Sequence, residues 1–446
     1  MSFFKQAKIQ SSDQTHSTIK ALQKTGSVVS GLLALSFCLL ASSQAQAIDI
    51  SFTKVVDTNT LVPNGTKTST FTYFFGNAPS LDNGSVAFLA NGILSTLPFQ
   101  EVGPQGVLGI YTNLGGSLNV LADTRTQIPG GTRNFFSLNS PSFKNGSVAF
   151  AGSLTQGSPT QSIYTNIGGS LNLVADLNTP VPGSTENFGY LTAPSLDNGS
   201  VAFLRSGLGL PIEGVYTNLG GSLSAIADMN TPIPGGTGNF TRFSNPSLSN
   251  GIVTFIGFGD SEEVSQAGIY TNLGGLLNAI ADTNTAIPGG TGNFTNFTSL
   301  SSENGSVAFI GQRRETISQP PSQQGIYTNL GGSLRAIADL NTPIPNGTGN
   351  FTSFRSLSLN KGNIAFLGAN SSSQGIYTNL SGLLTKVIAT GDSLDGKTVS
   401  SSVPQFDQGL LLGQQSLSGN QIAFSVGFTD GSEAIYIATV NSGNEE

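Results

Sequence analysis

A unit of 50 to 59 residues, present seven times, constrains the fold of this chain more than any other feature of its sequence. One element of the unit reads Val/Ile-Ala/Thr-Phe, and its phenylalanines are Phe88, Phe150, Phe203, Phe255, Phe309, Phe366 and Phe424. A second reads Ile/Val-Tyr-Thr/Ile, and its tyrosines, here called the repeat tyrosines, are Tyr111, Tyr164, Tyr216, Tyr270, Tyr327, Tyr377 and Tyr436. Repeats of this length are typical of propellers and solenoids.

Each unit predicts four short β-strands. The segments are rich in β-branched and aromatic residues, and they are separated by Asn-Gly pairs such as Asn83-Gly84, by Gly-Gly pairs and by Pro-Gly pairs. An Asn-Gly pair supplies the positive φ angles of a tight hairpin turn. Helical periodicity is missing after residue 47. Seven units of four antiparallel strands predict an all-β, seven-bladed β-propeller.

The two ends of the repeat array predict how it closes. The last unit stops after its third strand, whereas residues 52–60 match the fourth strand of the unit at residues 277–285. We therefore expect the N-terminal strand to complete the last blade, which leaves no unpaired sheet edge. The alternative is an open β-solenoid, which needs distinct capping units. The propeller is assigned to residues 48–440, and residues 441–446 to a disordered polar tail.

Residues 1–47 predict a signal peptide. Four lysines precede an apolar stretch at residues 28–41, and Ala45-Gln46-Ala47 provides a small-residue cleavage site. Cleavage after Ala47 would deliver a secreted or periplasmic protein, and the alternative is an uncleaved signal anchor. No later segment is apolar and long enough to cross a membrane.

Composition excludes several function classes. The single histidine, His16, and the single cysteine, Cys38, both lie in the leader, so imidazole or thiolate catalysis and zinc sites are excluded from the remainder. The leader holds 4 of the 18 basic and 1 of the 25 acidic residues, which leaves a net charge of −10. Such a dilute acidic surface disfavours nucleic acid. We expect no cofactor.

The repeat motif resembles that of a known group of proteins. The order Asn-Gly-Ser-Val-Ala-Phe, Gly-Ile-Tyr-Thr-Asn, Leu-Gly-Gly-Ser-Leu and Ile-Ala-Asp-x-Asn-Thr-Pro-Ile-Pro-Gly-Gly-Thr is similar to the repeats of uncharacterised secreted bacterial, including cyanobacterial, propeller-like proteins. Many of these carry a C-terminal PEP-CTERM sorting tail. This sequence ends instead in Asn-Ser-Gly-Asn-Glu-Glu. The resemblance implies a fold and no activity.

Positions that differ between units are the candidates for a ligand site, because features repeated seven times serve folding. The loop between the second and third strands varies in length, and loops on a rigid scaffold often bind ligands. Its candidate residues are Arg205, Glu213, Asp260, Glu262, Glu263, Arg313 and Arg314. The alternative for these charges is surface ion pairs or solvated loops.

A second variable position follows the first phenylalanine of each unit by two residues. Its candidates are Tyr73, Tyr190, Arg242 and Asn296, which would approach the channel if this strand is innermost. Side chains of these types suit a sugar or a small acid. The alternative is packing between the inner strands.

A recurring aspartate closes the fourth strand. It is found at Asp57, Asp123, Asp176, Asp228, Asp282 and Asp339, with Thr390 in the remaining place. The aspartate predicts an Asx turn, and the alternative is a weak Ca²⁺ ligand. Asp392 and Asp395 form a further, weaker candidate cation loop.

Taken together, these patterns predict an exported, non-catalytic propeller. It would act as a binding module or scaffold for an extracellular glycan or an envelope protein, through its variable-loop face. One alternative is a structural, protein-interacting surface element. Another is a polysaccharide hydrolase using two carboxylates, or a lyase using groups such as Tyr190 and Arg242.

Overall fold

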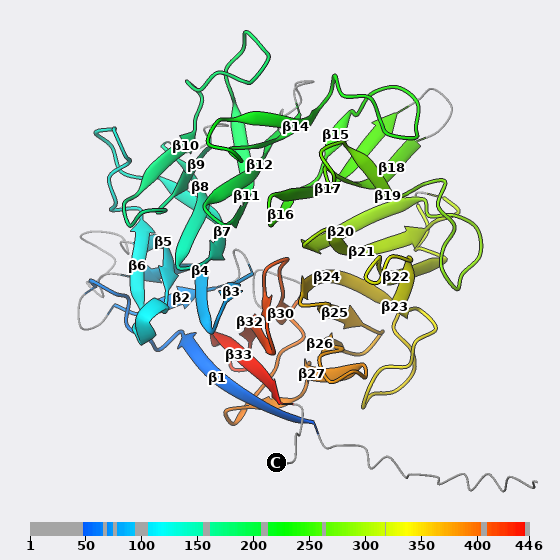
Figure 1. Cartoon of the computed structure of the whole chain (residues 1–446). Coiled ribbons are helices and arrows are strands. Elements are labelled where there is room, and N and C mark those ends of the chain that lie inside the picture. The colour runs from blue at the N-terminus through cyan, green and yellow to red at the C-terminus, as the bar shows by residue number, and fades with distance from the viewer. Residues whose placement is uncertain are drawn as a thin grey trace, which may run out of the picture. The chain divides into compact units, whose positions relative to one another are not determined.

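Seven antiparallel sheets form a seven-bladed β-propeller (Figure 1). The computed structural model describes residues 48–65, 69–74, 78–93, 106–154, 161–206, 213–260, 265–316, 318–402 and 408–441, all within one compact unit, Ala47–Glu446. The predicted signal peptide and residues 442–446 lie outside the described residues. Where the chain is described it contains no α-helix, only a 3₁₀ turn at Leu114–Gly116.

Each blade has four strand positions, numbered from the propeller axis outward. The first position holds β2 (Phe71–Tyr73) with β3 (Ser80–Asp82), β7 (Ser137–Lys144), β11 (Tyr190–Asp197), β15 (Arg242–Phe243) with β16 (Ser247–Ser249), β20 (Asn296–Glu303), β24 (Ser353–Asn360), and β30 (Leu410–Leu411) with β31 (Leu417–Ser418). The second position holds β4 (Ser85–Ile93), β8 (Ser147–Ser153), β12 (Ser200–Ser206), β17 (Ile252–Asp260), β21 (Ser306–Arg313), β25 (Asn363–Ala369) and β32 (Gln421–Gly427).

The outer two positions complete the sheets, and the blades are numbered 1 to 7 in chain order. The third position holds β5 (Gly106–Thr112), β9 (Ser162–Thr165), β13 (Gly214–Thr217), β18 (Ser265–Thr271), β22 (Gln323–Thr328), β26 (Gln374–Thr378) and β33 (Glu433–Asn441). The fourth holds β6 (Asn119–Asp123), β10 (Asn172–Ala175), β14 (Ser224–Asp228), β19 (Asn278–Asp282), β23 (Arg335–Asp339), β27 (Thr385–Ala389) and β1 (Asp49–Asp57). A small hairpin, β28 (Ser393–Leu394) and β29 (Lys397–Thr398), lies between blades 6 and 7 in the chain.

The predicted closure by the N-terminal strand is confirmed. β1 pairs antiparallel with β33, from Asp49 opposite Asn441 to Asp57 opposite Ala434, and Figure 1 shows the two strands side by side at the edge of blade 7. β28–β29 adds a polar latch, because Asp395 accepts a hydrogen bond from the Tyr436 hydroxyl at 2.7 Å and forms an ion pair with Lys54 at 3.4 Å. The candidate cation loop at Asp395 therefore serves this seam.

The hydrophobic core lies between the blades. Each of the seven clusters of buried side chains combines residues of two neighbouring blades. In blades 1 to 6 the repeat tyrosine meets the first phenylalanine of its unit edge to face, with ring centroids 4.8–4.9 Å apart. Such pairs add about 0.5–1.5 kcal/mol to the burial of their rings.

Burial keeps the repeat tyrosines protonated. It raises the pKa of Tyr270, Tyr327 and Tyr377 to about 12, and the charge of a nearby aspartate adds to the effect. The small residue two positions before the tyrosine has a packing reason, because a Cβ at Gly268 would lie 2.8 Å from the Tyr270 ring. These tyrosines are core residues.

The aspartates that close the fourth strands form Asx turns, as the first interpretation predicted. In six units one carboxylate oxygen accepts the backbone N–H two residues on, at 2.8–3.0 Å, and the threonine hydroxyl three residues on, at 2.7–3.3 Å. Blade 6 differs from the predicted alignment. Ala389, not Thr390, lies opposite Gly375, where the other blades have the aspartate. Asp392 turns back instead to accept the Ala389 N–H at 2.8 Å.

Candidate functional site

A ring of seven buried serines lines the propeller axis, six on the first strands of blades 1 to 6 and one directly before β31 of blade 7. Its members are Ser80, Ser142, Ser195, Ser247, Ser301, Ser358 and Ser416, all at most 5% exposed. In blades 1 to 6 the serine hydroxyl accepts a hydrogen bond from a backbone N–H of the next blade, at 2.7–3.1 Å. The ring therefore ties each blade to its neighbour.

Blade 7 closes this ring differently, through a segment that crosses the axis. The carbonyl of Gln415 accepts the N–H of Leu81 at 2.7 Å, and Ser416 donates to the carbonyl of Pro79 at 2.8 Å. The Gln415 side chain accepts from Ser80 at 3.1 Å and from Ser142 at 2.7 Å.

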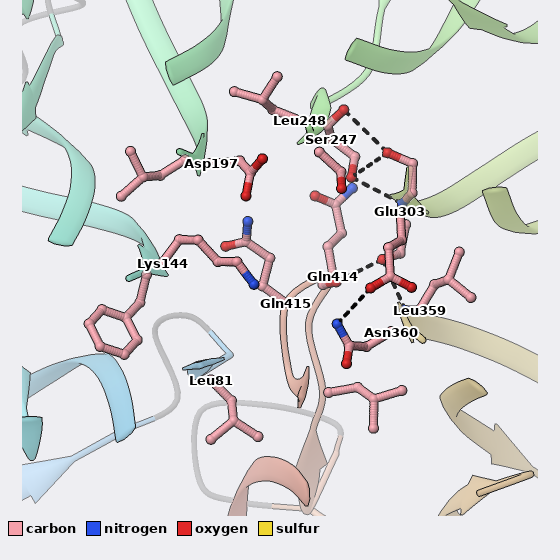
Figure 2. Close-up of a pocket in the computed structure, with 16 residues that line it drawn as sticks. Leu81, Lys144, Asp197, Ser247, Leu248, Glu303, Leu359, Asn360, Gln414 and Gln415 are labelled. Carbon is pink, nitrogen blue, oxygen red and sulfur yellow. Dashed lines mark hydrogen bonds between the residues drawn. The ribbon is translucent and has the colours of Figure 1, made fainter. Parts of the chain in front are cut away.

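The preceding residue, Gln414, bonds to blades 5 and 6. Its carbonyl accepts hydrogen bonds from Ser301 at 2.8 Å and from Ser358 at 2.9 Å. Figure 2 shows Gln414 and Gln415 extending between the first strands of the surrounding blades. This axial segment divides the channel into two cavities.

The two faces of the propeller are named by their loops. The Asn-Gly face carries the turns between the first and second strands, and the variable-loop face carries the second-to-third loops and the connections between blades. The cavity nearer the Asn-Gly face measures about 60 Å³. It is bordered by polar side chains that follow the serines by two residues, Lys144, Asp197, Ser249, Glu303 and Asn360.

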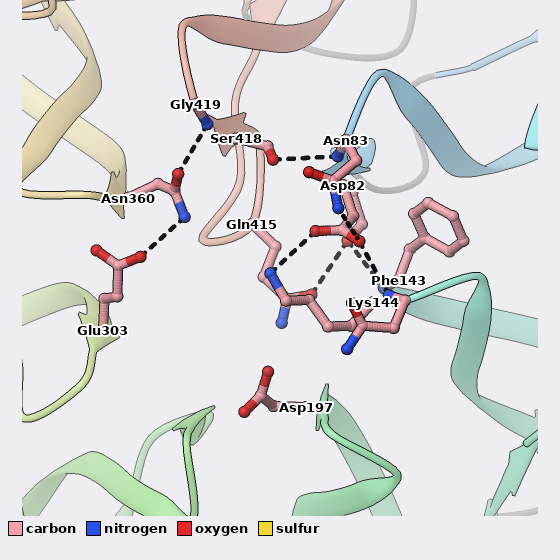
Figure 3. A network of polar contacts seen from close by, with 12 residues as sticks. Asp82, Asn83, Phe143, Lys144, Asp197, Glu303, Asn360, Gln415, Ser418 and Gly419 are labelled. Carbon is pink, nitrogen blue, oxygen red and sulfur yellow. Dashed lines mark hydrogen bonds and ion pairs between the residues drawn. The ribbon is translucent and has the colours of Figure 1, made fainter.

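These polar side chains mainly bond to one another and to neighbouring blades (Figure 3). Asp82 accepts from Lys144 and from the Asn145 N–H, both at 2.9 Å. Glu303 accepts from Asn360 at 3.0 Å, and Asn360 accepts from the Gly419 N–H at 2.7 Å. Groups used in this way link blades, so this cavity is the weaker candidate for a ligand.

The second cavity, here called the variable-loop cavity, measures about 240 Å³ and lies on the other side of Gln414 and Gln415. It is lined by Ala78, Pro79, Ser80, Ser140, Pro141, Ser142, Ala193, Pro194, Ser195, Asn245, Gly413, Gln414 and Gln415. None of these described lining residues is ionisable. The site offers hydroxyl groups, amide groups and the flat faces of prolines.

The predicted loop residues are used within the fold where they are described. Arg205 is 5% exposed, and its guanidinium donates to Glu186 at 3.1 Å and to the carbonyl of Asn187 at 3.3 Å. Glu213 accepts the backbone N–H of Phe243 in the next blade at 3.1 Å. Arg313 pairs with Glu315 at 2.9 Å. For Arg314 the bond is made by the main chain, because its backbone N–H donates to the Thr295 hydroxyl at 2.9 Å.

The acidic residues of the neighbouring loop cannot be assigned as partners of these arginines. Glu262 and Glu263 lie outside the described residues, and Asp260 ends β17 with its side chain undescribed. Because Arg313 binds Glu315 of its own loop, the ion-pair interpretation accounts for that arginine. The hydrogen bond from Arg313, and then its positive charge, lower the pKa of the Glu315 carboxyl.

The second predicted set lies at the start of the first strand position. Tyr190 lies opposite Ser206, and Asn296 opposite Gln312. Arg242 stacks on Phe258, with its guanidinium carbon 4.3 Å from the ring centroid. Burial and the nearby Glu433 raise the pKa of Tyr73 to about 12. None of these four lines either axial cavity.

Sequence reasoning missed the residues that do line the axis. The signal was present, since a serine occupies the same place in all seven units. Gly413-Gln414-Gln415 also departs from the Pro or Leu that precedes this serine in the other six units. That departure marks the segment that crosses the axis.

Glu433 provides a testable feature at the seam between blades 7 and 1. It is 5% exposed, and it accepts the Phe74 N–H at 2.8 Å. Its place, three residues before the repeat tyrosine, is taken in blade 5 by Gln324, which accepts the Phe354 N–H at 2.9 Å. A neutral amide thus performs the same task elsewhere in the molecule.

We predict that Glu433→Gln stabilises the protein at neutral pH. Burial raises the pKa of the Glu433 carboxyl above its unfolded value, so wild-type stability falls as pH rises from the unfolded pKa through the folded pKa. The variant, which cannot ionise, should be more stable by about 1 kcal/mol at pH 7. Below the unfolded pKa this advantage should vanish. Denaturant unfolding from pH 3 to pH 8 measures this, and parallel profiles for the two proteins would contradict it.

Comparison with known proteins identifies the family. Residues 49–441 match the family described as "Family of unknown function (DUF7453)", and the chain belongs to this family. No curated protein matches the chain in sequence.

Solved structures similar to the chain are propellers or contain them. The β-propeller domain of the Trilobed protease from Pyrococcus furiosus, described as having an open velcro topology, is 9% identical, with a TM-score of 0.48, over 84% of this chain and 100% of that one. An oligogalacturonate lyase in complex with manganese is 14% identical, with a TM-score of 0.44, over 88% and 97%. A puromycin-hydrolyzing peptidase of Mycobacterium tuberculosis is 12% identical, with a TM-score of 0.41, over 79% and 48%. The chain thus matches about half of that peptidase.

In the described part of the chain, no helix has the length and hydropathy needed to span a membrane. The same residues contain no group of three or more His, Cys, Asp or Glu side chains placed to hold a metal ion.

Proposed function

We propose that this protein is an exported, non-catalytic binding module that takes a neutral, polyhydroxylated ligand such as a glycan in the variable-loop cavity. The leader supports export, with Ile48 as the mature N-terminus that N-terminal sequencing of exported protein would read. The cavity lies on the face that carries the loops of variable length.

The uncharged lining of the variable-loop cavity is the observation that carries this proposal. Hydroxyl and amide groups exchange hydrogen bonds with sugar hydroxyls, and proline faces provide apolar contact. General acid–base catalysis needs a titratable group within reach of the reacting bond, and the lining residues that the structure describes supply none. The volume of about 240 Å³ is close to the lower end, roughly 300 Å³, of typical ligand sites, which suits one or two sugar residues.

Asn245 provides the test of this site. Its exposed side chain lines the cavity, so Asn245→Ala should weaken glycan binding about fivefold, the equivalent of one hydrogen bond. The purified protein would be tested for retention on cell-wall and exopolysaccharide preparations and for ligand-induced rises in melting temperature. Asn230→Ala, an exposed asparagine on the connection between blades 3 and 4, is the matched control.

Three results would count against the proposal. Equal binding by Asn245→Ala and wild type would remove the variable-loop cavity as the site. Release of reducing ends or unsaturated products from the polymers would favour the alternative of a polysaccharide hydrolase or lyase. Lack of retention on every polymer, together with a co-purifying envelope protein, would favour the structural scaffold.

A further inference from the structure

In blades 4 and 5 a glutamine forms hydrogen bonds with the segment that connects the preceding blade to its own, an arrangement here called the glutamine clasp. Gln266 accepts the Thr237 N–H at 3.0 Å, and its amide nitrogen donates to the Thr237 carbonyl and hydroxyl, both at 2.9 Å. Gln323 binds Thr291 in the same way, at 2.9, 2.8 and 3.0 Å. In each case one carboxamide is recognised by the N–H, C=O and hydroxyl of a single threonine.

Blade 6 keeps the threonine and lacks the glutamine. Thr348 occupies the place of Thr237 and Thr291 in the repeat, and Ser373 precedes Gln374-Gly375 as Gln323 precedes Gln324-Gly325. Asn370 replaces half of the clasp by donating to the Thr348 carbonyl at 3.1 Å. Within the described residues, no protein group accepts a hydrogen bond from the Thr348 N–H.

A cavity occupies the space that the glutamine side chain would fill. Beside Thr348 it measures about 240 Å³, whereas the corresponding cavity in blade 5, beside Gln323, measures about 60 Å³. The repeat tyrosine Tyr377 also lines it, as do Asn346, Ser372 and Thr390. The missing glutamine is thus accompanied by a larger polar cavity.

The charge at this cavity is balanced. Lys386 donates to Asp392 at 2.9 Å, and both line the cavity. A carboxylate ligand would meet the Asp392 charge, and an ammonium ligand would meet Lys386. The lining therefore favours a neutral ligand with a hydrogen-bond acceptor for Thr348.

We propose that this blade 6 cavity binds the acetamido group of an N-acetylated sugar. The acetamido carbonyl would accept from the Thr348 N–H, as the glutamine carbonyl does in blades 4 and 5, and the Thr348 hydroxyl would donate to the same carbonyl. The sugar hydroxyls would meet Asn346, Ser372 and Thr390. This site is separate from the axial site of the proposed function.

Ser373→Gln tests the proposal by restoring the residue that blades 4 and 5 carry. Binding of N-acetylglucosamine, glucose and acetamide to the purified protein would be measured by ligand-observed NMR and calorimetry. We expect N-acetylglucosamine to bind wild type at least tenfold more tightly than glucose. Ser373→Gln should weaken that binding tenfold or more without lowering the melting temperature, and the exposed-strand control Ser224→Gln should leave it unchanged.

A second variant keeps the test valid if Ser373→Gln is destabilised. Thr348→Val removes the hydroxyl and retains the N–H, so it should weaken N-acetylglucosamine binding severalfold while glucose binding stays the same. Undetectable N-acetylglucosamine binding to wild type, or undiminished binding to both variants, would overturn the proposal. Tighter binding of a glutamine-containing peptide would overturn the assignment to a sugar. Asn245→Ala should not affect this site, so failure here is distinguishable from failure of the axial proposal.

Discussion

A chain lacking β1 is expected to lose cooperative folding altogether. β1 supplies the whole outer strand of blade 7, buries Val56, and packs Ile50 and Phe52 against the core. Full burial of a side chain such as Val56 contributes about 1.5–3 kcal/mol, and the half-buried Ile50 and Phe52 contribute part of that amount each. Together with the lost strand pairing, this is a large fraction of the total stability of about 5–15 kcal/mol that is usual for a domain. Removal also exposes β33 as an unpaired edge that can join other chains. Circular dichroism melting and size-exclusion chromatography should show aggregates in place of a cooperatively melting monomer.

A peptide supplied in trans separates the role of the strand from the effect of shortening the chain. A peptide of residues 48–60 should restore a cooperative melt to the truncated protein, because it can pair with β33 in the native register. The same peptide with Val56→Asp should fail, since it would bury an unpaired charge. A truncated protein that melts as a monomer at the wild-type temperature would show that closure by β1 is dispensable.

The closure of the ring could be predicted from the sequence, because a segment outside the repeats can be aligned with the equivalent strand of every other unit. Residues 52–60 could be matched to the fourth strand of another unit, and β1 occupies that position in blade 7. Where a unit departs from the pattern, the comparison is less secure. In blade 6 the spacing from the turn glycine is unchanged, since Gly382 precedes Ala389 by as many residues as Gly332 precedes Asp339. Ala389 and not Thr390 therefore takes the aspartate's place, and matching Ile-Ala-Thr to Ile-Ala-Asp put the prediction one residue out of register.

The candidate site was harder to predict, because sequence variation does not show how a charge is used. Arg205 differs from its counterparts in other units, yet it is buried against Glu186. Glu213 accepts a backbone N–H of the next blade, as Gln324 and Glu433 do from the same place in their units. These partners come from different strands and connections, so spacing along the chain does not reveal them. Similarly, a polar cavity forms beside Thr348 where Ser373 stands in place of a glutamine.

The serine ring shows the opposite case, in which a repeated residue borders the site. Seven identical serines are explained by folding alone, since their hydroxyls tie neighbouring blades together. Their position on the axis nevertheless makes three of them part of the variable-loop cavity. A residue that is repeated in every unit for folding can therefore also contact a ligand, when the repeated residues surround the symmetry axis.

Gln415→Ala is expected to destabilise the protein by about 2–4 kcal/mol. The Gln415 carboxamide accepts hydrogen bonds from Ser80 and Ser142, which are 3% and 2% exposed. Truncation leaves two buried hydroxyls without this acceptor, at about 1–3 kcal/mol each. Water in the adjoining cavity can replace part of the bonding, which places the loss near the lower value. Denaturant unfolding at pH 7 would measure the difference.

Gln414→Ala is the matched control, because Gln414 contributes its backbone carbonyl, not its side chain, to the bonds with Ser301 and Ser358. The two variants remove the same atoms from adjacent residues, yet only Gln415→Ala removes side-chain bonds to the serine ring. Gln414→Ala should therefore stay within about 0.5 kcal/mol of wild type, because the half-buried Gln414 side chain takes no part in the hydrogen bonds between the axial segment and the described serines. Equal losses in both variants would mean that general packing of the axial segment, and not the carboxamide of Gln415, holds blade 7 to blades 1 and 2.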